Sequence, residues 1–180
     1  EKMLEIISFN LIVLDIMMPF KTGLEFTKEL KNRNYLLNIF KIYSNKPGKV
    51  SQSGWHSLAF NLTENTVVDW ISASAAIYNK HHIKNIYFEE FFKDYSYLED
   101  LDFSYSLKNK GVLIIVPDAQ YYHDNNIDRS SFSFGKKEIR NRTYFVKKNK
   151  LSLKLFIFAA TLKFLSNLFP NGNVSPTAKC

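Results

Sequence analysis

The sequence predicts an α/β fold, because segments patterned like strands are interspersed with segments patterned like helices. Residues 9–15 form a continuous apolar run rich in aliphatic residues, as in a strand buried on both faces. Residues 24–32 place apolar and charged side chains on opposite faces, as in a short amphipathic helix. Further along, residues 112–116 (VLIIV) predict another strand, and residues 151–169 predict a long apolar helix.

The composition is that of a protein with a real core. The chain has 180 residues, of which 46% are hydrophobic and 16% aromatic, and this excludes a disordered chain. The only cysteine is Cys180, so no intrachain disulfide can form, which fits a reducing compartment such as the cytoplasm. The chain opens with Glu1 and shows no secretory leader, so we expect it to be a fragment of a longer protein.

The first half of the chain alternates strands and loops. Pro19 ends the first strand, and Gly23 precedes the short helix. The composition changes after about residue 35. Residues 42–57 are rich in Ser, Gly, Lys and Pro and predict a loop or hairpin. Residues 66–80 then predict a strand followed by small residues.

A helix is predicted in the second half of residues 81–111, ending at Gly111. The side chains expected to pack inward from it are Leu98, Leu101, Phe103 and Tyr105. Three acidic residues crowd its first turn, where they complement the helix dipole: Glu99, Asp100 and Asp102. The strand VLIIV is expected to stop at Pro117, and a second extended piece leads to His123.

The C-terminal part is strongly basic. Of the net charge of +7, much lies between residues 136 and 154, where Glu138 is the main opposing acid. Because this region lacks zinc-finger spacing and ribonucleoprotein signatures, we expect an anionic membrane surface as partner and no nucleic acid. Lys154 and Lys163 interrupt the apolar run 151–169, so it predicts an amphipathic helix in the plane of the membrane surface.

Four motifs follow one another in the order typical of a known family. They are VDWISASAAIYNK (68–80), IYFEEFFKDYSYLEDLDFSYSLKNKG (86–111), VPDAQYYH (116–123) and RNRTYFVKKN (140–149). Over residues 38–165 the chain resembles the C-terminal half of the family 2 glycosyltransferases with a GT-A fold, in particular rhamnosyltransferase-like enzymes that build bacterial surface polysaccharides. The resemblance implies a partial GT-A (Rossmann-like) sheet with flanking helices, and a cytoplasmic enzyme peripheral to the inner face of the bacterial membrane.

In that family a sugar passes with inversion from a nucleotide-sugar donor to an acceptor hydroxyl, here a lipid-linked or oligosaccharide acceptor. By the match, Asp100 is the general base, Glu99 stands beside it and Asp102 is a third acid. Clustered carboxylates raise one another's pKa, which suits a base. The alternative is that these residues form only the acidic first turn of a helix.

The match also implies an acceptor side and a diphosphate side. Trp70, with Asp69 and Ser72, lines the acceptor side, and Trp55 of the SGW loop flanks the same pocket; for Trp70 the alternative is core packing. Candidates for contact with phosphate are Arg129, Arg140 and Arg142, for which the alternative is a solvated basic face.

A divalent cation, Mn²⁺ or Mg²⁺, is the cofactor that the resemblance implies. His123 follows a strand where the family often has a histidine that helps to hold this cation, and an imidazole suits Mn²⁺ better than Mg²⁺. A structural role for His123 is the alternative. His81 and His82 are expected at the surface, and zinc-ligand spacing is absent from the sequence.

Residues 1–32 instead resemble the middle of a response-regulator receiver domain, in which Asp15 is the phosphoacceptor. The alternative is a divergent transferase strand in which Asp15 occupies the place of the family's acidic metal-binding motif. We therefore expect a receiver-like or degenerate segment (1–36), an acceptor-side half (37–150), a membrane-surface helix (151–170) and a disordered tail (171–180).

Without the nucleotide-binding half, this chain alone is expected to be inactive. A signalling module phosphorylated at Asp15 and a non-catalytic membrane-surface binding protein are the alternative functions.

Overall fold

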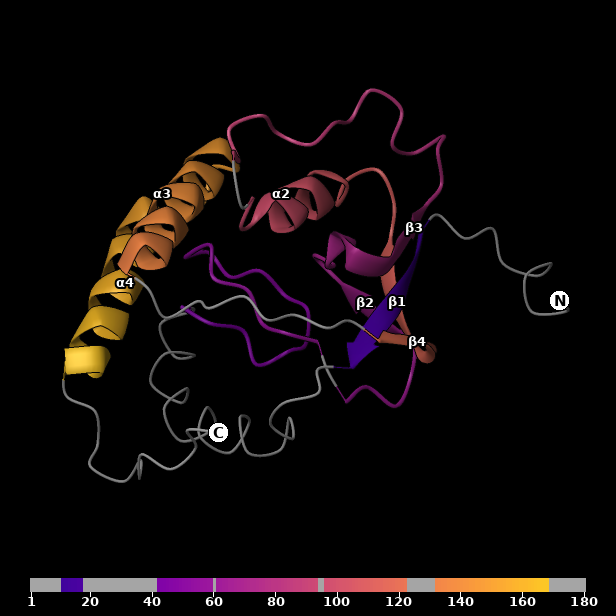
Figure 1. Ribbon diagram of the computed structural model, residues 1–180, viewed down its shortest axis with the longest axis horizontal. Helices are drawn as coiled ribbons and strands as arrows, with labels where there is room; N and C mark the ends of the chain where they lie inside the picture. Colours follow the sequence, from indigo (N-terminus) through magenta and orange to yellow (C-terminus); the bar gives the residue numbers. More distant parts are fainter. Residues whose placement is uncertain (1–10, 18–41, 60, 94–95, 123–131, 169–180) are drawn as a thin grey trace, which may run out of the picture.

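The computed structural model describes residues 11–17, 42–59, 61–93, 96–122 and 132–168. Figure 1 shows a small sheet at one side of the molecule and a pair of long helices at the other. A short helix and a long irregular loop lie between them. The structure therefore has the mixed α/β character that the sequence predicts.

The sheet has four strands in the order β2-β4-β1-β3. Their bounds are β1 Leu11–Met17, β2 Thr66–Val68, β3 Ala76–Tyr78 and β4 Leu113–Tyr122. β1 runs parallel to β4, whereas β3 pairs antiparallel with β1 and β2 antiparallel with β4. The strands predicted near residues 9–15, after residue 66 and at 112–116 are thus confirmed. A 3₁₀ turn, η1 (Ala73–Ala75), joins the small-residue segment to β3.

The expectation that Pro117 stops its strand is wrong, because β4 continues to Tyr122. The register explains how a proline fits there. Leu14 of β1 pairs with Val116, but Asp15 pairs with Gln120, so residues 117–119 bulge out of the ladder between β1 and β4. A bulge leaves residues unpaired, and proline, which has no backbone N–H to donate, is tolerated at such a position.

Helix α2 (Glu99–Ser106) packs on both of its sides. Phe103 and Leu107 join a core with the sheet residues Leu113 and Ile115. Leu98 and Leu101 belong to a second core, formed mainly with the helix pair. Its other buried members are Phe92, Phe145, Val146 and Phe156. Burying one such side chain stabilises the fold by about 1.5–3 kcal/mol. The four predicted inward positions are confirmed, but the helix ends at Ser106 rather than at Gly111, because residues 107–111 form turns.

The helix pair consists of α3 (Phe132–Lys148) and α4 (Leu153–Leu168). α3 ends in a Schellman motif: Lys150 has φ 53°, and the Leu151 N–H donates to the Val146 carbonyl at 2.9 Å. α4 begins directly afterwards, where the Ser152 hydroxyl oxygen accepts a hydrogen bond from the Leu155 N–H at 3.3 Å. Two chemically different caps thus fix a tight turn between the helices.

Residues 42–59 form an irregular loop that connects the sheet to the helix pair, as expected from its composition. At one end the Asp69 N–H donates to the Gly48 carbonyl at 2.7 Å, and at the other the Ser152 N–H donates to the Gln52 carbonyl at 2.8 Å. Gly54 lies against Val146 of α3 with φ +77°. A third buried cluster joins the loop to α4 through Ile42, Trp55 and Ala159.

The helix predicted over residues 151–169 is confirmed as α4, but its amphipathic character is not. Phe156 and Ala159 are buried on its inner side, whereas Leu153, Ile157 and Phe164 are exposed, so both sides are apolar. Within the parts of the chain that the structure describes, no helix has the length and apolar character needed to cross a bilayer.

Candidate functional site

The predicted base, Asp100, lies in the first turn of α2 and is half-buried. The helix begins after Leu98, whose left-handed backbone (φ 76°) turns the chain into it. The Leu101 N–H donates to Oδ1 of Asp100 at 2.8 Å. Glu99 beside it is also half-buried. Both residues therefore keep part of their surface in contact with solvent.

Ser104, one turn further along α2, connects the predicted base to the predicted acceptor side. Its buried hydroxyl oxygen lies 2.6 Å from the Asp100 backbone carbonyl and 3.0 Å from the Ile71 carbonyl, and its single proton donates to one of the two. The Ile71 N–H in turn donates to the Ser104 oxygen at 3.3 Å. Because Ile71 stands between Trp70 and Ser72, this contact brings the two predicted parts of the site together.

The acceptor-side residues are all held by internal partners. Asp69 accepts hydrogen bonds from Lys49 Nζ and the Val50 N–H, both at 3.1 Å, and thereby clamps the loop 42–59. The half-buried Trp70 donates from Nε1 to the Ser57 carbonyl at 3.0 Å. Ser72 caps the turn η1 and shares a hydrogen bond of 2.9 Å with the Ser74 hydroxyl. Trp70 thus packs partly against the core, as its alternative role predicts, while part of it stays exposed.

Asp102 does not face the same side as Asp100, which corrects its assignment as a third catalytic acid. Its side chain is 2% exposed and forms an ion pair of 2.6 Å with Lys148 of α3. Lys148 also pairs with Glu89 at 3.1 Å. Burial lowers the pKa of Lys148, but the hydrogen bonds and charges of Asp102 and Glu89 outweigh this and raise it. Asp102 therefore ties α2 to α3 and is shielded from solvent.

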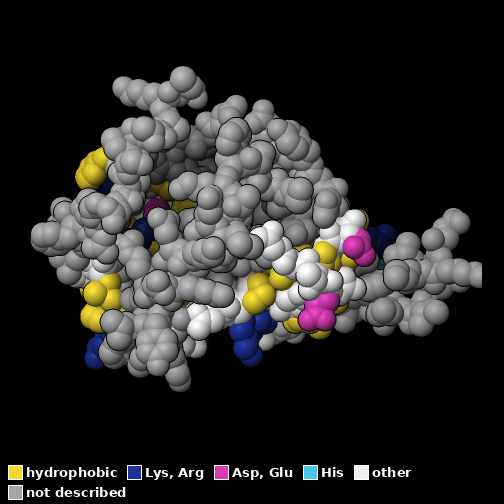
Figure 2. Space-filling model, turned by 90° about the horizontal axis from the view of Figure 1, so that it is seen from below, with side chains coloured by type: hydrophobic (Ala, Val, Ile, Leu, Met, Phe, Trp, Pro, Cys, Tyr) yellow, Lys and Arg dark blue, Asp and Glu magenta, His cyan; other side chains and the backbone are white. Residues whose placement is uncertain are grey.

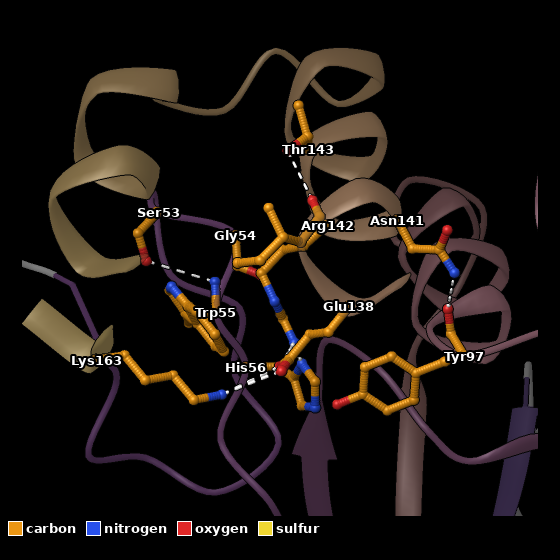
Figure 3. A network of polar contacts seen from close by, with 11 residues as sticks. Ser53, Gly54, Trp55, His56, Tyr97, Glu138, Asn141, Arg142, Thr143 and Lys163 are labelled. Carbon is orange, nitrogen blue, oxygen red and sulfur yellow. Dashed lines mark hydrogen bonds and ion pairs between the residues drawn. The ribbon is translucent and has the colours of Figure 1, made fainter. Parts of the chain in front are cut away.

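Arg142 is neither a phosphate contact nor part of a solvated face, because it is 1% exposed. Its Nη1 donates to the Gly54 carbonyl at 2.8 Å, and its Nη2 donates to Glu138 at 3.3 Å. Figure 3 shows Arg142 reaching from α3 past Gly54 toward His56 and Glu138. A buried guanidinium that is bonded in this way anchors the loop to the helix pair.

Trp55 is also misplaced by the sequence interpretation, since it is 4% exposed and cannot stack on a sugar in this structure. Two cations cover its ring: Arg142 Cζ lies 4.0 Å and Lys163 Nζ 4.5 Å from the ring centroid. Tyr43 stacks on it at 5.7 Å. Trp55 belongs to the core between the loop and α4.

His56 sits inside the same network, next to Trp70 at a ring separation of 4.4 Å. Burial, followed by the charges of Arg142 and Lys163, holds the pKa of His56 well below its ordinary value of 6.5, so the ring is neutral at physiological pH. Burial also raises the pKa of Tyr43 to about 12. The pKa shifts of His56 and Tyr43 thus favour the neutral form of both side chains within this network.

The remaining predicted residues lie apart from this centre. Arg140 is exposed, and its Cζ lies 4.8 Å from the ring centroid of Phe91. Arg129 and His123 lie outside the described residues, so their phosphate and metal roles stay predictions. Asp15 lies within β1 rather than at its end.

β1 and β4 end at a common edge of the sheet. Because β1 and β4 are parallel, Met17 and Tyr122 both stand where their strands end, and they pair with each other. His123 is the next residue along the chain. In the described parts of the chain, no three His, Cys, Asp or Glu side chains are grouped to hold a metal ion. The divalent cation therefore stays a prediction.

Ser104, His56 and Lys148 hold segments of the site together, but they are not among the residues that the sequence predicts for it. Only the ion pair of Arg142 with Glu138 has a local signal, because the two residues are four positions apart on a helix. The contacts of Ser104 and His56 join segments 33 and 86 residues apart, so no local pattern announces them.

Searches for related proteins returned no match, whether among family models, curated proteins or solved structures.

Proposed function

We propose that the chain is the acceptor-side part of an inverting glycosyltransferase that moves a sugar from a nucleotide-sugar donor to a bacterial surface-glycan acceptor. The proposal is supported by the order of the four sequence motifs. It is also supported by the contact through Ser104, which joins the helix of Asp100 to the segment of Trp70 and Ser72.

In this proposal Asp100 takes the proton from the acceptor hydroxyl as that oxygen attacks the anomeric carbon of the donor. The bond between that carbon and the nucleotide diphosphate breaks, and the diphosphate leaves with the electron pair. Asp100 is half-buried in the first turn of α2, so part of the residue remains in contact with solvent. His123 would help to hold the divalent cation that the resemblance implies, and such a cation would neutralise charge on the diphosphate.

The test is a glycosyl-transfer assay of the full gene product with a panel of nucleotide sugars. Asp100→Asn keeps the oxygen that accepts from the Leu101 N–H but loses the base. We expect turnover to fall by about 10²–10⁴-fold with the KM for the donor unchanged. Unchanged turnover in Asp100→Asn would remove Asp100 as the base.

Asp102→Asn serves as the structural comparison. Because Asp102 is buried against Lys148, this change should lower the denaturation midpoint, whereas Asp100→Asn should leave the midpoint in place. Loss of activity that follows the midpoint in both variants would show that folding rather than proton transfer is affected.

A peripheral location at the inner face of the membrane is the second part of the proposal. It is supported by the apolar side chains that α4 exposes and by the basic residues around them. The same observations also fit a non-catalytic membrane-surface binding protein. Such a protein would bind vesicles but would show no transfer activity with any of the donors tested.

A further inference from the structure

The outer side of α4 carries a stripe of exposed apolar side chains. Leu153, Ile157 and Phe164 are 38%, 55% and 62% exposed. At 3.6 residues per turn, positions separated by four and seven residues lie on one side of a helix. Soluble proteins expose single apolar residues commonly, but a row of three large ones on one helix indicates a surface that meets something apolar.

The lysine that should break this stripe does not reach it. Lys163 turns to the inner side, where its Nζ lies 3.2 Å from Glu138 Oε2 and 4.5 Å from the Trp55 ring centroid. Figure 3 shows Lys163 directed toward Glu138. Lys154, the other lysine in the apolar run, is exposed in the first turn of α4. The outer side of α4 is therefore more apolar than the sequence suggests.

The surroundings of the stripe are basic. Residues 139–168 contain seven Lys and Arg and no Asp or Glu, although Arg142 is buried and Lys148 and Lys163 pair with acidic residues outside this range. Lys147, Lys150 and Lys154 are exposed at the turn between α3 and α4. Figure 2 shows hydrophobic and basic side chains close together at the side of the molecule that carries the helix pair.

This charge distribution favours one kind of partner. A second copy of the chain seated on the stripe would bring like charges together, which is destabilising. A bilayer with anionic headgroups offers an apolar interior beneath a layer of negative charge, and it matches both features.

We propose that α4 lies in the plane of an anionic lipid surface, with Leu153, Ile157 and Phe164 inserted between the lipids. Lys147, Lys150 and Lys154 then contact the lipid phosphates. The proposal rests on the peripheral location proposed above and adds the face that docks, whereas the transfer reaction is independent of it.

The test is sedimentation of the full chain with vesicles of phosphatidylcholine alone or mixed with phosphatidylglycerol. We expect binding to the mixed vesicles that weakens as salt is added. Ile157→Ser and Phe164→Ser should each weaken it about tenfold, because each removes one inserted side chain. The matched control is Ile77→Ser on β3, since Ile77 is 58% exposed and should not change binding.

Each other result overturns a distinct part of the proposal. No binding to either vesicle contradicts the peripheral location itself. Equal binding of Ile157→Ser and Ile77→Ser contradicts the insertion of the α4 face but not the peripheral location. Equal binding to both kinds of vesicle contradicts the anionic partner. A change from dimer to monomer in Ile157→Ser, measured by light scattering, would assign the stripe to a second copy. Denaturation midpoints of the three variants should agree, because all three side chains are exposed.

Discussion

Arg142 illustrates what a single buried charge does in this protein. Its guanidinium holds the loop through the Gly54 carbonyl and α3 through Glu138, and it covers the ring of Trp55. Removing one partner of such a group leaves a buried charge uncompensated, which costs more than the pair contributes. The sequence shows only a basic run here, because the loop that accepts these bonds lies 88 residues away.

His56 makes the stability of the fold depend on pH. Because burial and the charges of Arg142 and Lys163 hold its pKa well below 6.5, the unfolded chain takes up a proton at a higher pH than the folded chain. The stability contributed by neutral His56 is complete above pH 6.5 and is lost as the pH falls through the folded-state pKa. We expect up to about 1.4 kcal/mol of lost unfolding free energy per pH unit from this group.

Urea denaturation between pH 7.5 and pH 5 measures this dependence. His56→Gln should flatten the curve relative to the unchanged chain, whereas His81→Gln should not, because His81 is exposed. Identical slopes for the two variants would contradict a role of His56 in the pH dependence.

Two glycines show that the effect of one substitution depends on the element that contains it. Gly54 has φ +77°, and a Cβ there would overlap with Val146, so Gly54→Ala should destabilise the fold by at least about 1 kcal/mol. Gly135 lies in α3 with nothing within 4 Å of an added Cβ, so Gly135→Ala should stabilise it by about 0.5–1 kcal/mol.

Thermal or urea denaturation of both alanine variants checks the opposite signs. If Gly54→Ala proves neutral, the close approach between the loop and α3 is absent in solution. If Gly135→Ala destabilises, that position of α3 is packed rather than open.

At the scale of elements, the sequence predicted what local pattern determines. The strands near residues 9–15 and 112–116 and the helix α4 follow from runs of apolar residues, and the inward positions of α2 follow from its periodicity. The continuation of β4 past Pro117 depends on its register with β1, which no local pattern contains. Asp102 was misassigned because α2 is covered on two sides, so an acidic residue in its first turn faces another helix.

The candidate site was predictable only in part. The first-turn position of Asp100 and the proximity of its helix to Trp70 and Ser72 agree with the motif order. The burial of Trp55 and Arg142 does not, because residue type alone cannot distinguish a tryptophan or arginine that binds ligand from one that fills a core.

The whole described molecule should unfold as one unit. α2 belongs to both large cores, and α4 packs on the loop through Ala159 and Trp55. The described sheet and helices are therefore joined by continuous packing. In a Trp70→Phe variant the remaining tryptophan, Trp55, reports on the junction of loop and α4. Its fluorescence and the far-ultraviolet circular dichroism should change at the same urea concentration.

A Trp55→Phe variant, which reports from Trp70 instead, is the control and should give the same midpoint. A fluorescence transition of Trp55 that precedes the dichroism change would show that the helix pair detaches first, and that a boundary exists near residue 150.

The sheet contains no local hairpin among its described strands, and this has a consequence for how the chain reaches its structure. Val13 pairs with Ile115, about 100 residues away, and closing a loop of that length costs about 4 kcal/mol of chain entropy before any contact is gained. The turn between α3 and α4 closes within a few residues. The helix pair can therefore form early, whereas β1 can pair with β3 first but must wait for β4 before both of its edges are paired.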